Sequence, residues 1–235
     1  MTKLIELKNV KKIYKVGQEI VKALNGITIT IEKGEICCIL GTSGSGKSTL
    51  LNMLAGLEPP TKGEIFIGKY PIHKMSETQL TNFRRENVGF VFQSYNLMAG
   101  LPAWANVAMP LEFRGMEKKQ REKEAIAMLK AVNLENRVNH TPGEMSGGQQ
   151  QRVGIARAFV HHPKLVFADE PTGNLDSKTT VEVMELMVDM AKKHNQTLII
   201  VTHDPEIADY SDRIIHLIDG KIDSDVKVEK NISAV

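Results

Sequence analysis

The stretch GTSGSGKSTLLNMLAG, residues 41–56, contains four glycines in sixteen positions and leads directly into a sequence typical of a helix. Glycine in ordered structure costs about 0.5–1 kcal/mol relative to alanine, so such a cluster needs a geometric reason. The spacing G-x-x-x-x-G-K-S, from Gly41 to Ser48, matches loops in which successive backbone N–H groups converge on one anion. The stretch therefore predicts a phosphate-binding loop rather than an ordinary glycine-rich turn.

The surroundings of this loop support the same interpretation. The preceding run GEICCIL, residues 34–40, is apolar, as a strand buried on both faces should be, and the helix that follows has a positive N-terminal end. Lys47 would act as a point charge on the β- and γ-phosphates, and the Ser48 hydroxyl suits Mg²⁺. The residues expected to bind the nucleotide phosphates are Gly41, Ser43, Gly44, Ser45, Gly46, Lys47, Ser48 and Thr49.

The composition is that of a globular chain with a substantial core. The 235 residues carry a formal net charge of +2, with 42% hydrophobic and 25% charged residues and no long block of one sign, so nothing indicates nucleic acid. No apolar run approaches the roughly 20 residues that span a bilayer, and the N-terminus lacks signal-peptide features, so a cytoplasmic location is expected. The adjacent Cys37 and Cys38 are interpreted as reduced core residues.

Hydrophobic periodicity predicts an α/β fold. Residues 1 to about 72 combine strand-like alternation, typical of an antiparallel β layer, with the phosphate loop. Helical sequence follows at 75–86 and 116–134, interrupted by a strand at 88–93. Beyond residue 163, strands and helices alternate as in a parallel sheet. One helix there has an apolar stripe expected to pack in the core, formed by Val181, Met184, Met187, Val188 and Ala191.

Three further strands of the predicted fold end in polar groups. The run KLVFADEP ends in Asp169, a candidate Mg²⁺ ligand, and Glu170, a candidate general base for an attacking water. Gln93 closes the strand VGFVFQ and offers an amide oxygen to Mg²⁺ or water, whereas His203 closes TLIIVTH and can donate to a γ-phosphate. Ligands of open parallel sheets bind beyond these strand ends, so the four side chains are expected at one edge.

The stretch EMSGGQQQRVGIARAFV, residues 144–160, predicts a second anion site. Ser146 and Gln149 have the spacing of a capping box, and the helix that follows has apolar residues facing a core. On the simplest interpretation Ser146 is only a helix cap. However, Gly147 and Gly148 weaken a first helical turn unless something must approach the backbone closely.

The motifs together resemble the complete motif set of an ATP-binding cassette (ABC) ATPase. In chain order they are GTSGSGKST, FQ, MSGGQQQRV, LVFADEP, GNLD and VTH. The resemblance covers about residues 3–222. It implies a P-loop NTPase (RecA-like) core sheet with an N-terminal antiparallel β subdomain and an inserted α-helical subdomain. The whole chain, 1–235, would be one ABC ATPase domain, with 94–161 as the helical subdomain and 1–93 and 162–235 as the rest.

The resemblance also implies how the motifs act. Two cassettes would pair head to tail with ATP and Mg²⁺, so that Ser146, Gly147, Gly148 and Gln149 of one chain close over the ATP held by Lys47 of the other. Asp176 would lie at the dimer seam, although it also suits a helix N-cap. Tyr14 matches the aromatic residue that stacks on adenine; without the resemblance it would be an ordinary strand tyrosine. Loss of the γ-phosphate would let the dimer open.

Within the family, the sequence most resembles cassettes of lipoprotein release, macrolide or peptide export and antimicrobial-peptide resistance, and those of the related cell-division complex. Their partners are FtsX-like permeases, which implies a peripheral location on the inner face of the membrane. The chain departs from the usual pattern at Thr42, at Met145 and around Trp104. The last change falls where a permease would dock, so Met98, Leu101 and Trp104 form either a docking patch or a packed edge.

Other classes remain as alternatives. A P-loop kinase has no use for the MSGGQ motif, and soluble ABC proteins of translation or DNA maintenance usually carry two cassettes or a long coiled-coil insertion. An ATPase of a binding-protein-dependent importer, which would copurify with a many-span permease, is the nearest rival. The sequence names neither the transported molecule nor the direction of transport, and it assigns no role to the tail VKVEKNISAV, residues 226–235.

Overall fold

The computed structural model describes residues 2–228, which form two compact units. One unit contains the described residues up to Leu80 and those from Thr197 onward, and the other is Thr81–Gln196. Residues 229–235 of the C-terminal tail lie outside the described part. The expected subdivision of one cassette into 1–93, 94–161 and 162–235 stays a prediction.

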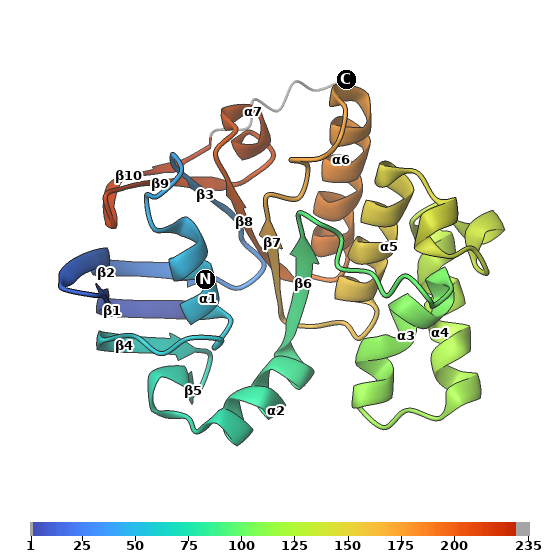
Figure 1. The fold of residues 1–235 in the computed structure, drawn as a ribbon, viewed down its shortest axis with the longest axis horizontal. Coiled ribbons are helices and arrows are strands. Elements are labelled where there is room, and N and C mark those ends of the chain that lie inside the picture. The colour runs from blue at the N-terminus through green and yellow to red at the C-terminus, as the bar shows by residue number, and fades with distance from the viewer. Residues whose placement is uncertain (1, 229–235) are drawn as a thin grey trace. The chain divides into compact units, whose positions relative to one another are not determined.

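The N-terminal half of the first unit is an antiparallel sheet with the strand order β2-β1-β4-β5 (Figure 1). Its strands are β1 (Lys3–Val16), β2 (Glu19–Glu32), β4 (Lys62–Ile67) and β5 (Tyr70–Pro71). Alternating side chains of β2 are buried along its second half, which is the pattern of a sheet with one face against a core. The antiparallel β layer expected within residues 1–72 is thereby confirmed.

The same unit contains a second group of strands built around β3 (Ile36–Leu40). This strand pairs in parallel with β8 (Thr197–Thr202) and with β9 (Arg213–Ile218), and β9 pairs in an antiparallel manner with β10 (Lys221–Lys227). Every residue of β3 and β8 is buried, which explains their unbroken apolar sequence. Cys37 and Cys38 are buried in β3, and neither forms a disulfide within the described structure.

Short helices complete this unit. Helix α1 (Lys47–Leu54) follows the phosphate loop and packs against β2 and β8, burying its leucines and Met53. Helix α7 (Pro205–Ala208) packs against β3 and β8. A 3₁₀ turn, η1 (Ile72–Lys74), precedes α2 (Glu77–Asn87), whose first turn belongs to this unit and whose remainder, from Thr81 onward, belongs to the second unit.

The second unit is mainly helical and is organised around α5. It contains one parallel strand pair, β6 (Val88–Phe92) with β7 (Leu165–Asp169). Its helices are α3 (Ala103–Phe113), α4 (Lys118–Ala131), α5 (Gly147–Phe159) and α6 (Ser177–Lys193), with 3₁₀ turns η2 (Glu135–Arg137) and η3 (Pro142–Glu144). Helix α5 contacts β6 and the other three helices, because its apolar face is almost wholly buried (Figure 1).

One expectation about the core is wrong. Met184, Met187, Val188 and Ala191 of α6 are buried, but Val181 is 44% exposed. At 3.6 residues per turn, Val181 lies roughly 120° around the helix from Met187, at the margin of the stripe. Val183, which the sequence analysis left out, is fully buried instead.

Candidate active site

The phosphate loop begins where β3 ends and closes into the N-terminus of α1. The N–H of Gly41 donates to the carbonyl of Thr202, which holds the start of the loop against β8. Gly46 has φ +102°, and a Cβ there would collide with the backbone carbonyl of Ala23, so only glycine fits. Helix α1 has no side-chain cap, and its first amides therefore suit an anionic ligand.

The side chains within the loop also fit a polyanion. Lys47 is only 7% exposed, and its Nζ donates to the carbonyls of Gly41 (2.7 Å) and Thr42 (2.9 Å). The Oγ of Ser45 is buried and has no hydrogen-bond partner within the described residues. A buried hydroxyl without a partner costs free energy unless a ligand forms a hydrogen bond with it. Ser48, at the start of α1, is exposed.

Tyr14 precedes the phosphate loop in the chain and His203 follows it, and both belong to the same unit as the loop. Tyr14 is half-buried near the end of β1, and its hydroxyl lies within hydrogen-bonding reach of Thr49 in α1. His203 follows Thr202, which is in register with Leu40 of β3, so it lies at the strand edge from which the loop emerges. The first unit therefore brings together the phosphate loop, Tyr14 and His203.

The second unit brings together Gln93, Asp169 and Glu170. Phe92 of β6 is in register with Asp169 of β7, so Gln93 and Glu170 leave adjacent parallel strands at the same edge. Glu170 has φ +44°, a left-handed conformation that is costly for a residue other than glycine and is often found at functional sites. The Nδ2 of Asn174 donates to the carbonyl of Gln93 (3.0 Å) and links the loops after the two strands.

The predicted capping box at the start of α5 is confirmed. The Oγ of Ser146 accepts from the N–H of Gln149 (3.3 Å), and the Oε1 of Gln149 accepts from the N–H of Ser146 (3.1 Å). Ser146, Gly148 and Gln149 line a small cavity of about 250 Å³ together with Arg152. The cavity is polar, and the guanidinium of Arg152 pairs there with the carboxylate of Glu182 (2.6 Å).

The two glycines that follow Ser146 have a reason within the chain. A Cβ on Gly147 would lie 2.8 Å from the hydroxyl of Tyr95, and a Cβ on Gly148 would lie 2.5 Å from the methyl group of Thr179. The close approach that the glycine pair suggested is therefore made by side chains of the same chain. Both neighbouring atoms are ends of movable side chains.

Asp176 is the N-cap of α6, as its position suggested. Its carboxylate accepts from the N–H (3.0 Å) and the hydroxyl (2.7 Å) of Thr179. These two hydrogen bonds hold the pKa of Asp176 below its usual value. Thr179 thus connects the α6 cap with Gly148 of α5.

Two polar residues of α5 that the sequence analysis did not select hold the loops of this unit. The Nε2 of Gln151 donates to the carbonyl of Pro171 (2.5 Å), next to Glu170. The guanidinium of Arg157 donates to the carbonyls of Tyr95 (2.8 Å) and Asn96 (2.5 Å), which follow Gln93, and burial lowers the pKa of Arg157. A sequence signal was present, because both interrupt the apolar face of a buried helix.

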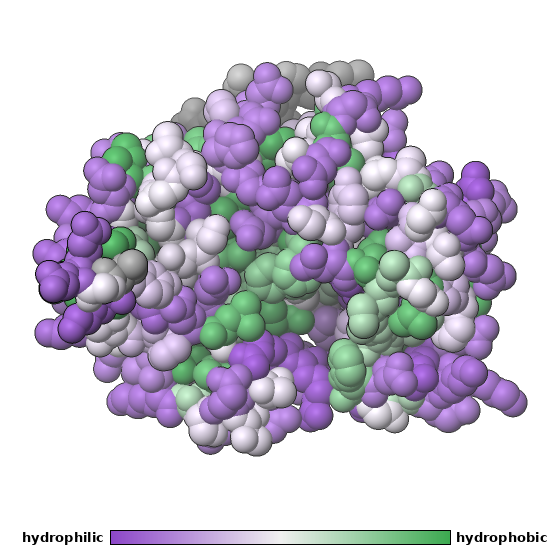
Figure 2. Space-filling view, viewed as in Figure 1, coloured by the Kyte–Doolittle hydropathy of each residue, from purple (hydrophilic) through white to green (hydrophobic). Residues whose placement is uncertain are grey.

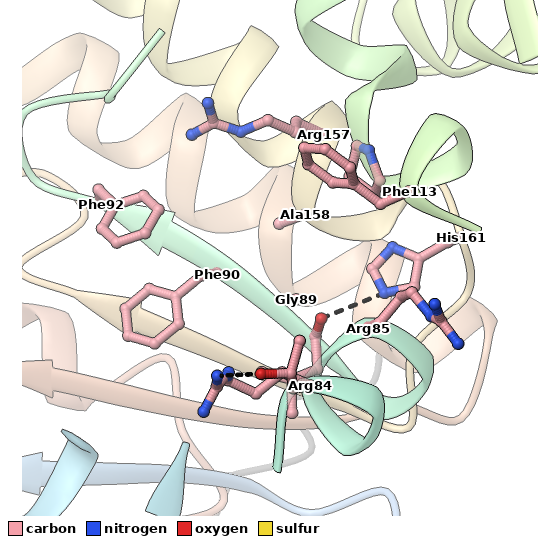
Figure 3. A pocket seen from close by; sticks show the side chains of 12 residues that line it. Arg84, Arg85, Gly89, Phe90, Phe92, Phe113, Arg157, Ala158 and His161 are labelled. Carbon is pink, nitrogen blue, oxygen red and sulfur yellow. Dashed lines mark hydrogen bonds between the residues drawn. The ribbon is translucent and has the colours of Figure 1, made fainter. Parts of the chain in front are cut away.

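A larger cavity of about 500 Å³ lies within the second unit between β6, α3 and α5. Phe90 and Phe92 project from the same side of β6 with ring centroids 4.6 Å apart, and Phe113 of α3 is 65% exposed (Figure 3). On the face shown in Figure 2, apolar residues gather around the position of β6 and the edge of α3. The guanidinium groups lining the cavity belong to Arg84, Arg85 and Arg157.

His161, which the sequence analysis assigned to no site, also lines this cavity. Its Nε2 lies 3.1 Å from the carbonyl of Val88, and its Nδ1 is buried with no partner within the described residues. Burial, together with the nearby charge of Arg114, lowers the pKa of His161 to about 4. The imidazole is therefore neutral at neutral pH.

Comparisons with known proteins agree with this arrangement. The family model described as ABC transporter matches residues 24–173. An ABC transporter ATP-binding protein of Methanocaldococcus jannaschii, MJ0796, is 44% identical over 229 residues, which cover 96% of this chain and 97% of that protein. The lipoprotein-releasing system ATP-binding protein LolD of Legionella pneumophila is 47% identical, with 90% and 93% of the two chains covered.

A multidomain relative and a solved structure extend this picture. The macrolide export ATP-binding/permease protein MacB of Chlorobium phaeobacteroides is 45% identical over 96% of this chain, which spans only 34% of that protein. A dimeric structure of the MJ0796 cassette in a post-hydrolysis state, bound to ADP and Pi, matches with a TM-score of 0.89 and 42% identity, covering 97% of this chain and 100% of that one. The predicted fold class is confirmed.

The chain belongs to the ABC transporter family, as an ATP-binding and ATP-hydrolysing cassette. Within the family, it is similar to LolD and to the part of MacB that it matches. Within residues 2–228, no helix is both long enough and apolar enough to cross a membrane.

Proposed function

We propose that this cassette forms a head-to-tail homodimer around ATP and that its closing and opening drive a membrane permease. The observation that carries the proposal is the match, over 97% of the chain, to a dimeric cassette bound to ADP and Pi. The two anion-binding surfaces support it, because one polyphosphate can be shared by the loop before α1 and the start of α5 of a second chain. Loss of the γ-phosphate removes the group that both surfaces share.

In this proposal the phosphate loop binds the nucleotide and Lys47 neutralises its β- and γ-phosphates. The ligands for Mg²⁺ would be the Ser48 hydroxyl, the Gln93 amide oxygen and the Asp169 carboxylate, all hard oxygen donors. When bound, the ion screens the phosphate charge. The orphan Oγ of Ser45 and the uncapped amides of α1 support the fit of the loop to phosphate.

Glu170 would orient and deprotonate the attacking water, and His203 would donate to the γ-phosphate. The left-handed backbone of Glu170 supports this role, since strain is retained where a side chain must point in one direction. The loops around Gln93 and Glu170 are held by Asn174, Gln151 and Arg157 through carbonyl groups. Their task is to keep the base and the amide in position.

In the dimer, Ser146, Gly147, Gly148 and Gln149 would close over the ATP of the partner chain, and Asp176 would lie at the seam. The cavity lined by Ser146 and Gln149 supports this contact, because a capping serine and helix amides attract an anion.

We infer further that the permease is FtsX-like and docks a cytoplasmic segment in the 500 Å³ cavity. The three phenylalanines offer an apolar floor, and Arg84 and Arg85 of α2 add positive charge at the cavity, so the segment would carry an apolar anchor beside a carboxylate. Such a partner would hold the cassette on the inner face of the membrane. Export, lipoprotein release or antimicrobial-peptide resistance would be the process served, with a cell-division-type complex as a further possibility.

The decisive experiment measures the mass of the Glu170→Gln variant by light scattering with saturating Mg-ATP. The variant should bind ATP, lose about 10²-fold or more in turnover and accumulate as a dimer, because hydrolysis no longer opens it. The double variant Glu170→Gln/Ser146→Arg is the control and should stay monomeric. A Glu170→Gln variant that binds ATP but remains monomeric without a permease contradicts the proposal.

The partner is tested by purification from native membranes. Phe113→Asp should lose the permease while retaining ATP binding, whereas Val181→Asp, a change at another exposed apolar side chain on α6, should retain both. Recovery of a four-span permease with a large outer domain supports the FtsX-like assignment, and recovery of a many-span permease with a solute receptor favours the importer.

A further inference from the structure

Tyr14 is one member of a cluster with Lys12 and Glu58. Lys12 and Tyr14 are two residues apart on β1, with a shift of the β1–β2 register between Lys12 and Ile13. The Nζ of Lys12 lies 5.2 Å from the centroid of the Tyr14 ring. The carboxylate of Glu58 bridges both side chains: Oε2 accepts from the Tyr14 hydroxyl (2.7 Å), and Oε1 lies 2.9 Å from the Lys12 Nζ.

The segment that carries Glu58 is anchored along β1. The carbonyl of Pro59 accepts from the Nζ of Lys12 (2.9 Å), and the N–H of Thr61 donates to the carbonyl of Lys11 (2.8 Å). Two consecutive prolines stiffen the chain between these contacts. The Glu58 carboxylate is therefore presented from a restrained loop, and the Lys12 side chain is only 12% exposed.

The protonation states of Tyr14 and Glu58 favour the hydrogen bond that holds the Tyr14 ring. Burial raises the pKa of Tyr14, and the hydrogen bond to Glu58 raises it further, so the phenol stays neutral. Burial opposes ionisation of Glu58, but the hydrogen bonds from Tyr14 and Lys12 outweigh it and the pKa of Glu58 is lowered. The Tyr14 hydroxyl thus lies between a carboxylate and Thr49 of the phosphate-loop helix.

We propose that Glu58, supported by Lys12, is a positioning residue that holds the Tyr14 ring for stacking on the nucleotide base. The inference rests on the proposed function, in which Tyr14 stacks on adenine. Lys12 covers one face of the ring, so the base stacks on the other. A ring already held in its bound orientation loses less conformational freedom when the base arrives, and binding is tighter.

A matched control exists on the same strand. Lys8 of β1 lies over the ring of Phe66 (5.0 Å to the centroid), and Glu6 lies 3.5 Å from Lys8. This second cluster has the same chemistry of acid, lysine and aromatic ring, but its aromatic residue has no role in the proposed nucleotide site. Glu6→Ala therefore reports the generic effect of removing such a carboxylate.

The test compares binding of ATP with binding of inorganic tripolyphosphate, which has no base, by calorimetry and competition. Glu58→Ala should weaken ATP binding roughly 5- to 10-fold and leave the tripolyphosphate Kd unchanged, because only the base contact is affected. Tyr14→Phe should reproduce this loss, and the double variant should lose no more. Glu58→Gln, which still accepts from the hydroxyl, should restore most of the affinity, and Glu6→Ala should match the parent chain.

The outcomes separate the inference from the proposed function. Tyr14→Ala should weaken ATP binding roughly 10- to 100-fold through lost stacking, and an unchanged Kd for this variant overturns the stacking role itself. The positioning role of Glu58 is overturned if Tyr14→Ala weakens ATP binding but Glu58→Ala binds ATP as tightly as Glu6→Ala does. An equal loss of ATP and tripolyphosphate binding in Glu58→Ala also overturns it, because the phosphate loop would then be disturbed.

Discussion

The N-termini of α1 and α5 are both suited to anions, but only α5 has a side-chain cap. Helix α1 follows Gly46 in a left-handed conformation and has no side-chain cap, whereas α5 begins with the complete box of Ser146 and Gln149. Amides at α1 are therefore available to a ligand, and some at α5 already bond to their own chain.

The glycines at the two helix starts also differ in what an added side chain would contact. A side chain at Gly46 would collide with the backbone carbonyl of Ala23, which belongs to β2 and is fixed by the sheet. Side chains at Gly147 and Gly148 would meet the movable ends of Tyr95 and Thr179. The backbone around Gly46 therefore leaves no room for a side chain, whereas the side chains that face Gly147 and Gly148 can rotate away.

The largest effect that tests this comparison is on ATP affinity. Lys47→Ala should weaken ATP binding by single chains about 100-fold, because a buried charged donor to the phosphates is lost. Ser146→Ala should leave the affinity of single chains within about twofold, since in the proposed dimer α5 contacts only the partner's nucleotide. Calorimetry at concentrations that keep the chains monomeric measures both, and an equal loss in the two variants breaks the comparison.

The next effect is on folding. Gly46→Ala should lower the free energy of unfolding by about 2–3 kcal/mol, through the left-handed backbone and the collision with a carbonyl. Gly148→Ala should cost less than about 1 kcal/mol, because Thr179 can rotate away and alanine favours a helix. Urea denaturation of both variants gives the difference, and similar values would show that the second glycine is equally constrained.

The C-terminal side of α5 predicts a pH dependence. The pKa of His161 is lowered from 6.5 to about 4, so the folded state binds fewer protons than the unfolded state. Its contribution to stability is present above pH 6.5 and is lost as the pH falls towards 4, about 2 kcal/mol between pH 7 and pH 5. His161→Gln should remove this part of the slope in denaturation curves. An unchanged slope in His161→Gln would refute the assignment.

The smallest effect separates capping from ligand binding at α5. Ser146→Ala should lower the free energy of unfolding by about 1 kcal/mol, whereas Ser146→Asp should retain the cap. In the Glu170→Gln background, Ser146→Asp should nevertheless prevent the ATP-dependent dimer, because its charge repels the γ-phosphate. Thermal denaturation and light scattering measure the two properties, and dimer formation by Ser146→Asp would show that this position faces no phosphate.

Features made within a few residues of sequence could be predicted. The box at Ser146 and the cap at Asp176 depend on backbone groups three residues away, and the phosphate loop has its glycines and Lys47 in one short stretch of sequence. The buried strand β3 could be predicted from its unbroken apolar run, since parallel strands are covered on both faces. Local spacing carries these signals because the geometry is local.

Contacts between distant residues could not be predicted in this way. The Tyr14 hydroxyl meets Glu58, 44 residues away, and Arg157 donates to the Tyr95 carbonyl across 62 residues. No spacing rule joins such pairs, so the sequence does not show which distant residue each of these side chains contacts. The exposure of Val181 was missed because the edge of an apolar stripe depends on what packs beside the helix.

The left-handed backbone of Glu170 has a consequence for the evolution of this chain. Glycine adopts that conformation without strain, so a Glu170→Gly change would relieve a local cost while deleting the carboxylate. In the proposed mechanism this change would also remove the general base, so selection for heat resistance alone would favour an inert cassette. Glutamate at a position that penalises its backbone is therefore expected where durability is traded against work.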